Sequence, residues 1–99
     1  MNRPNNGPLN KKKYYQEKIK FINLEFHQKA QQLSKVLDID RMDHFMMELK
    51  RNIEENKIIP LENFYTNLNN QYKNFELDDI SKSLKDFKNT LEELIQTLE

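Results

Sequence analysis

The feature that most constrains this chain is the spacing of its apolar residues between positions 11 and 37. These residues recur at steps of three and four, and no Gly or Pro interrupts them: Tyr15, Ile19, Ile22, Phe26, Ala30, Leu33 and Leu37. Residues three and four apart share one face of a helix, so the pattern predicts one amphipathic helix over 11–37. Such a helix would be about 40 Å long.

Three further stretches carry the same helical spacing, and we expect helices at roughly 40–56, 60–75 and 78–99. Asp40 is a good N-cap, and Pro60 is tolerated in a first turn. The three apolar stripes are Met42, Phe45, Met46, Leu49 and Ile53; Leu61, Phe64, Leu68, Tyr72 and Phe75; and Ile80, Leu84, Phe87, Leu91, Leu94 and Leu98. The fold class predicted is therefore all-α, a compact bundle of about four helices.

The chain is expected to hold one domain. Residues 1–10 contain the only Gly and two of the three Pro, and we interpret them as a disordered lead-in to a single helical domain at 11–99. Cys is absent, which excludes disulfides and thiolate chemistry. No apolar run has the length of a transmembrane helix, so the chain as given is expected to be soluble.

The net charge of zero hides an asymmetry. Residues 1–37 carry eight Lys or Arg against two Glu, whereas residues 38–99 carry eight against fourteen Asp or Glu. The basic cluster consists of Lys11, Lys12, Lys13, Lys18 and Lys20. This cluster would suit an anionic membrane surface, although pairing between the first helix and its neighbours also explains the split. Arg is scarce and no nucleic-acid-binding module is visible, so we expect no nucleic-acid partner.

Catalytic and metal-binding residues are few. Apart from Gly7 the chain has no Gly to build a phosphate loop, and its two His lie on different predicted helices. Asp40, His44 and Glu48 share the spacing of a helical metal site, but a solvated face is the simpler interpretation. We predict no catalytic residues, no metal and no enzymatic activity.

A surplus of apolar residues lies off the main stripes: Tyr14, Phe21, Leu24, Met46, Met47, Ile58 and Ile59. They either fill the core between the helices or form a patch or groove that accepts an acyl chain or a partner helix. Met side chains are flexible and adapt to varied apolar partners. We therefore predict a non-enzymatic binding module in which these seven residues bind lipid or a partner, with phospholipid or fatty acid as the ligand.

The composition and two stretches carry a resemblance. Lys and Asn occur thirteen times each, Asn67-Leu68-Asn69-Asn70 is rich in Asn, and the stretches are KKKYYQEKIKFI (11–22) and LKDFKNTLEELIQTLE (84–99). In these respects the chain resembles the soluble domains of malaria-parasite liver-stage membrane proteins of the group "up-regulated in infective sporozoites".

That resemblance implies a protein anchored in the parasitophorous vacuole membrane by a segment not in this chain. The soluble domain would face the host cytosol, bind phospholipid and associate with a host fatty-acid-binding protein, a lipid carrier. Residues 11–20 would then lie nearest the bilayer.

Two alternatives remain open. One is a cytoplasmic helical protein that mediates protein–protein interaction. The other is a bundle similar to bacteriocin-immunity proteins, which are also small, lysine-rich and free of Cys. Neither alternative has a lipid ligand.

Overall fold

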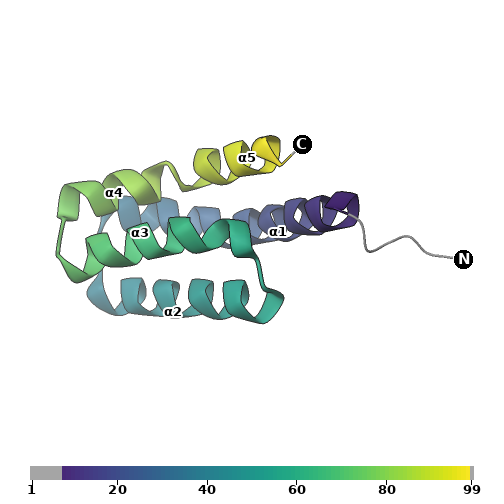
Figure 1. Cartoon of the computed structure of the whole chain (residues 1–99). Coiled ribbons are helices and arrows are strands. Elements are labelled where there is room, and N and C mark those ends of the chain that lie inside the picture. Colours follow the sequence, from purple (N-terminus) through teal and green to yellow (C-terminus); the bar gives the residue numbers. More distant parts are fainter. Residues whose placement is uncertain (1–7, 99) are drawn as a thin grey trace, which may run out of the picture.

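The computed structural model describes residues 8–98 of the chain, and it describes side chains from residue 11 onward. Its elements are α1 (Pro8–Lys35), α2 (Ile39–Asn56), a 3₁₀ turn η1 (Ile59–Leu61), α3 (Glu62–Lys73), α4 (Leu77–Lys85) and α5 (Phe87–Thr97) (Figure 1). No strand occurs in this range. The predicted all-α fold is confirmed. The predicted count of four helices is wrong, because the stretch expected as one last helix forms two.

The long helix α1 is the element on which the others pack. It contacts α2, α4 and α5, while α3 closes the bundle between α2 and α4 (Figure 1). The turn between α1 and α2 and the turn between α3 and α4 lie at the same end of the bundle, and the chain then returns through α4 and α5 toward the start of α1 (Figure 1). Within residues 8–98, none of the helices combines the length and the apolar character needed to cross a bilayer.

Two predicted boundaries shift in the structure. Helix α1 begins at Pro8, so residues 8–10 belong to the helix and not to the lead-in; the rest of the predicted lead-in, 1–7, lies outside the described residues. Helix α2 is capped by Asp38, whose carboxylate accepts a hydrogen bond from the Arg41 backbone N–H at 3.2 Å. Asp40, the cap expected from sequence, lies in the first turn.

The break between α4 and α5 falls at Asp86, where the sequence has neither Pro nor Gly. Helix kinks without those residues arise where a side chain enters the backbone hydrogen-bond ladder. Here the Asn23 side-chain amide of α1 donates a hydrogen bond to the Lys88 carbonyl at 3.3 Å, in the first turn of α5. This contact lies two residues after the break, and backbone hydrogen bonds from the Asp86 N–H to the Lys82 carbonyl and from the Thr90 N–H to the Asp86 carbonyl continue across it.

The core is built from the apolar stripes of all five helices. Four aromatic rings form a chain across it: Phe26 of α1 contacts Phe45 of α2, which contacts Phe87 of α5, which contacts Phe64 of α3. Their centroids are 5.5–5.9 Å apart in edge-to-face arrangements, the geometry that aromatic pairs prefer. Side chains therefore fill the centre of the bundle.

Candidate functional site

The seven residues predicted to bind lipid or a partner do not form one site, because two of them belong to the core. Met46 is 5% exposed and Ile58 is fully buried. Met46 lies beside Leu49 and Ile53 on the buried face of α2. Ile58 follows the left-handed Lys57 that ends α2, and its N–H donates to the Ile53 carbonyl at 2.9 Å. This helix-ending motif brings Ile58 back onto the core, so Met46 and Ile58 follow the core-filling alternative and cannot belong to an exposed patch.

The other five candidates are exposed, but on three separate elements. Tyr14, Phe21 and Leu24 lie on α1, Met47 on α2 and Ile59 in η1. Met47 is 60% exposed because it lies on the opposite side of α2 from the buried stripe. Only the α1 residues are numerous enough on one element to form a surface.

The outer face of α1 combines apolar and basic side chains. Phe21 is 52% exposed and Leu24 is 75% exposed, on the side of the helix opposite the buried stripe. At 100° per residue, Lys13 and Lys20 lie on the same side as Leu24, with Glu17 between them. We call the surface formed by Lys13, Lys20, Phe21 and Leu24 the α1 outer face.

Tyr14 borders the α1 outer face and also holds the fold. Its hydroxyl donates to the Asn56 carbonyl at 2.7 Å, which ties the first half of α1 to the last turn of α2. Its ring packs edge-to-face against Tyr15, and the Lys18 Nζ lies 5.5 Å from the ring centroid. Lys18 is therefore half-buried against an aromatic ring, whereas the other lysines of the predicted basic cluster are exposed: Lys11, Lys12, Lys13 and Lys20.

A groove of about 1020 Å³ lies between the second half of α1 and the first half of α2. Its apolar floor consists of Phe26, Leu33 and Phe45, each almost fully buried. Lys29 and Lys35 line the α1 side, and the α2 side carries Asp38, Asp40, Arg41, His44 and Glu48. The helical pattern of each segment did not predict this groove, because it forms only where the two helices pair.

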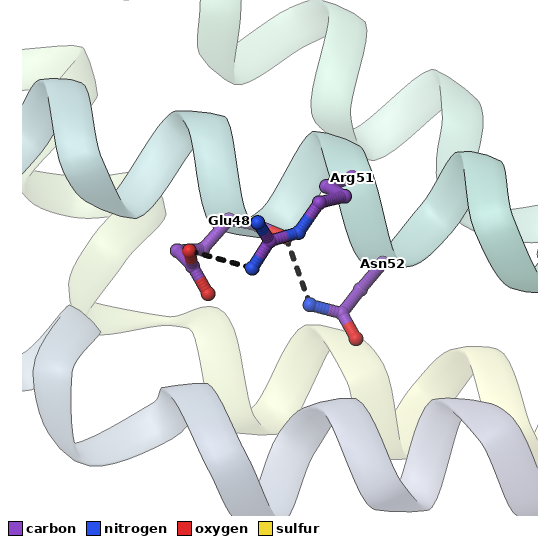
Figure 2. Close-up of polar contacts among 3 residues, drawn as sticks. All are labelled: Glu48, Arg51 and Asn52. Atoms are coloured by element: carbon purple, nitrogen blue, oxygen red, sulfur yellow. Dashed lines mark hydrogen bonds and ion pairs between the residues drawn. The ribbon is translucent and has the colours of Figure 1, made fainter.

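The three residues with metal-site spacing, Asp40, His44 and Glu48, line this groove without forming a metal centre. Glu48 pairs instead with Arg51 at 2.8 Å, and its backbone carbonyl accepts a hydrogen bond from the Asn52 side chain at 2.9 Å (Figure 2). Among the described residues, no group of three or more His, Asp or Glu side chains is arranged to hold a metal ion.

A smaller hollow of about 260 Å³ lies between α2 and α3, beside Tyr65. Burial raises the pKa of Tyr65, and the negative charge of Glu54 raises it further. Both residues line the hollow together with Ile53 of the core. A neutral phenol beside a carboxylate can donate one hydrogen bond, and Lys50, Glu62 and Thr66 complete the lining of the hollow.

One apolar surface was missed by sequence reasoning. It consists of Val36, Ile39, Phe75 and Leu77, all exposed and all in or beside the two turns at one end of the bundle; we call it the bundle end. Phe75 was predicted as the last residue of a buried stripe. It instead lies past the end of α3 in a left-handed conformation (φ 53°), which turns its side chain away from the core. No local sequence signal marks that conformation, since Gly and Asn are the residues usually found there.

Comparisons with known proteins do not add an identity to this geometry. No protein-family model, curated protein sequence or solved structure matches the chain. The resemblance to the sporozoite-protein group therefore stays a prediction that rests on composition and on residues 11–22 and 84–99.

Proposed function

We propose that this domain is a non-enzymatic binding module that associates with anionic lipid surfaces through the α1 outer face. The observation that carries the proposal is the exposure of Phe21 and Leu24 beside Lys13 and Lys20 on one side of a long helix. Exposed apolar side chains flanked by lysines are typical of helices that lie in the membrane interface.

Electrostatic attraction and insertion of apolar side chains both favour binding to an anionic membrane. Each lysine close to an anionic bilayer contributes about 1 kcal/mol of attraction, and the exposed Lys13 and Lys20 lie on the same side of α1 as Leu24. Insertion of Phe21 and Leu24 would each contribute about 1–2 kcal/mol through removal of apolar area from water. Together these terms are large enough for reversible binding and too small for permanent insertion.

The filled core favours a lipid surface over a single enclosed fatty acid. The chain of four Phe rings occupies the centre of the bundle, and the apolar stripes of the helices are buried around it. Close-packed interiors leave no room for an acyl chain without displacing side chains, and the groove between α1 and α2 is open and lined mostly by charged and polar side chains above its apolar floor. We therefore propose that headgroups and the upper acyl region of a bilayer are the ligand.

The family resemblance extends this proposal to a place and a partner. In a protein anchored in the parasitophorous vacuole membrane, the basic first half of α1 would lie against the bilayer and the acidic remainder would face the host cytosol. A host fatty-acid-binding protein is then the proposed protein partner. The alternatives without a lipid ligand, a cytoplasmic interaction module or an immunity-type bundle, need none of these contacts with lipid.

Vesicle co-sedimentation tests the lipid proposal. We expect the domain to bind vesicles that contain phosphatidylserine and not vesicles of phosphatidylcholine alone, with binding that weakens as salt rises. The double variant Phe21→Ser/Leu24→Ser should bind at least about tenfold more weakly, because it loses the inserting side chains. Met47→Ser is the matched control, since it removes an equally exposed apolar side chain from another helix.

Two results would contradict the proposal. One is equal binding to both kinds of vesicle, which would mean that the lysines do not act on headgroup charge. The other is an unchanged affinity for the Phe21→Ser/Leu24→Ser variant while its circular dichroism matches the parent. A domain that binds neither kind of vesicle would leave the protein–protein alternatives as the function.

A further inference from the structure

We infer that the bundle end is a docking surface for a basic amphipathic segment of a protein partner. This inference does not rest on the lipid proposal, because it concerns different residues at a different place on the molecule. It is carried by three observations: an apolar patch, the backbone conformation that exposes part of it, and the charges around it.

The apolar patch joins two turns that are distant in sequence. Val36, Ile39, Phe75 and Leu77 are between 48% and 73% exposed. The Tyr72 hydroxyl lies 3.3 Å from the Ile39 carbonyl, and the Ser81 hydroxyl donates to the Ser34 carbonyl at 2.9 Å. These contacts hold the two turns side by side at one end of the bundle (Figure 1). Single exposed apolar residues are ordinary, whereas a group of four in adjoining turns marks an interaction surface.

The backbone at Phe75 is in the left-handed conformation, which a bulky residue such as Phe disfavours. Its N–H donates to the Tyr72 carbonyl at 3.1 Å, and the next N–H, of Glu76, donates to the Gln71 carbonyl at 3.0 Å. This motif places Phe75 in the left-handed region, where Gly is favoured and a bulky residue is strained. The Phe75 side chain is 67% exposed, so its burial in the core does not compensate for the free-energy cost of the left-handed backbone. Lys57 adopts the same conformation (φ 52°) where α2 ends, so the helix-ending motif itself accounts for the backbone, and its effect at Phe75 is to leave a large aromatic side chain exposed at the bundle end.

The charges around the patch select the partner. Six exposed carboxylates lie in the same two segments, namely Asp38, Asp40, Asp43, Glu76, Asp78 and Asp79. Some also serve the fold, since Asp38 caps α2 and Asp43 accepts a hydrogen bond from Tyr72. Three positive charges lie in or next to the same segments, namely Lys35, Arg41 and Lys73, so carboxylates outnumber them by six to three. An acidic rim around an apolar centre is complementary to an amphipathic segment whose polar face is rich in Lys or Arg.

The bundle end and the α1 outer face are far enough apart to be occupied together. Val36, the residue after α1, lies fifteen positions beyond Phe21, which corresponds to roughly 22 Å along the helix. The first half of α1 is basic and the bundle end is acidic. An anionic membrane would therefore attract the first half of α1 and repel the bundle end. A partner on the bundle end would therefore not compete with lipid.

Binding of designed peptides tests the inference. The probes are a fluorescent Leu/Lys amphipathic peptide of about 18 residues and a Leu/Glu peptide with the same pattern of leucines. We expect the Leu/Lys peptide to bind and the Leu/Glu peptide not to bind, with amide chemical-shift changes at residues 36–39 and 75–79. Phe75→Ser/Leu77→Ser and Val36→Ser/Ile39→Ser should each weaken binding at least about tenfold. Asp78→Asn/Asp79→Asn should weaken it less and reduce its salt dependence.

Met47→Ser is the matched control, because Met47 is exposed and belongs to neither proposed surface, and it should leave peptide affinity unchanged. Three results would overturn the inference: equal binding of both peptides, shift changes confined to other surfaces, or unchanged affinity in both bundle-end variants. Concentration-dependent self-association that Phe75→Ser/Leu77→Ser abolishes would also overturn it, because a second copy of the chain would then cover the patch.

Discussion

The Tyr72 hydroxyl of α3 lies 2.5 Å from the Asp43 carboxylate of α2 and donates a hydrogen bond to it. This contact joins the last turn of α3 to the first half of α2, beside the bundle end. Burial, the hydrogen bond to Asp43 and the charges of Asp43 and Asp40 together raise the pKa of Tyr72 to about 12, with burial as the largest cause. The neutral phenol is therefore the form that the folded state stabilises.

Tyr72→Phe should lower the free energy of unfolding by about 1 kcal/mol at pH 7, because it removes one hydrogen bond to a charged acceptor. The parent should also lose stability as the pH rises from about 10 toward 12. In that range the unfolded state releases the Tyr72 proton while the folded state retains it, so rising pH favours unfolding. Urea denaturation of both proteins at pH 7 and pH 11 measures the two effects.

Asp43→Asn is the control for this pair, since it keeps an acceptor near Tyr72 but removes the negative charge. We expect the high-pH loss of stability to be smaller in this variant than in the parent. A Tyr72→Phe protein with the same high-pH loss as the parent would show that other groups cause it.

The neighbouring methionines of α2 offer a matched test of which apolar residues form the core. Met46→Ala should lower the free energy of unfolding by about 2–3 kcal/mol, because Met46 is buried and its removal leaves a cavity. Met47→Ala should change it by less than about 0.5 kcal/mol, because Met47 is mostly exposed. Thermal or urea unfolding measures both. Equal effects would mean that α2 is rotated from the orientation described above.

Relief of the left-handed conformation at Phe75 should stabilise the fold. The free energy of unfolding of the Phe75→Gly variant should be about 1 kcal/mol higher than that of the Phe75→Ala variant. Both variants lose the aromatic side chain, but only Gly adopts φ 53° without strain. Denaturant titration of the two variants isolates the backbone term. A Phe75→Gly protein no more stable than Phe75→Ala would show that the backbone here is not strained.

Substitution of Asn23 tests how much a buried polar side chain contributes to stability. Asn23 is 8% exposed, and its side-chain oxygen has no hydrogen-bond partner among the described residues. Asn23→Leu should be neutral or stabilising by up to about 1 kcal/mol, because it removes an unsatisfied buried atom. Asn23→Asp should destabilise by about 2 kcal/mol or more, since it buries a charge. If Asn23→Leu is the more damaging change, the bond to Lys88 outweighs the unpaired oxygen.

Helical periodicity predicted most of the core correctly. In α1, the stripe residues Ile19, Ile22, Phe26, Ala30 and Leu33 are buried, and Tyr15 and Leu37 pack against them. The same holds for Ile80 and Leu91, which lie on opposite sides of a helix break that the pattern did not predict. The reason is that α4 and α5 both pack against α1, so the same apolar stripe faces the core on both sides of the break.

Candidate binding residues were harder to predict, because a position off the main stripe does not say whether a side chain is exposed. Met46 lies at the edge of its stripe and still packs in the core, while Met47, one residue on, points to solvent. Ile58 is buried because the helix ends in a motif that turns the chain back. Phe75 is exposed for the same kind of reason, since its left-handed backbone ends α3.

The sequence by itself determined that this protein is all-helical, most of the residues that line the buried stripes, and that its first third is basic while the remainder is acidic. Those properties depend on spacing along one helix and on counts of charge. Only the tertiary structure decided where the last helix breaks, that a groove separates α1 from α2, and that two distant turns meet to form an apolar, acid-rimmed end. These features arise between helices, where the packing partner of a residue sets its exposure and its backbone geometry.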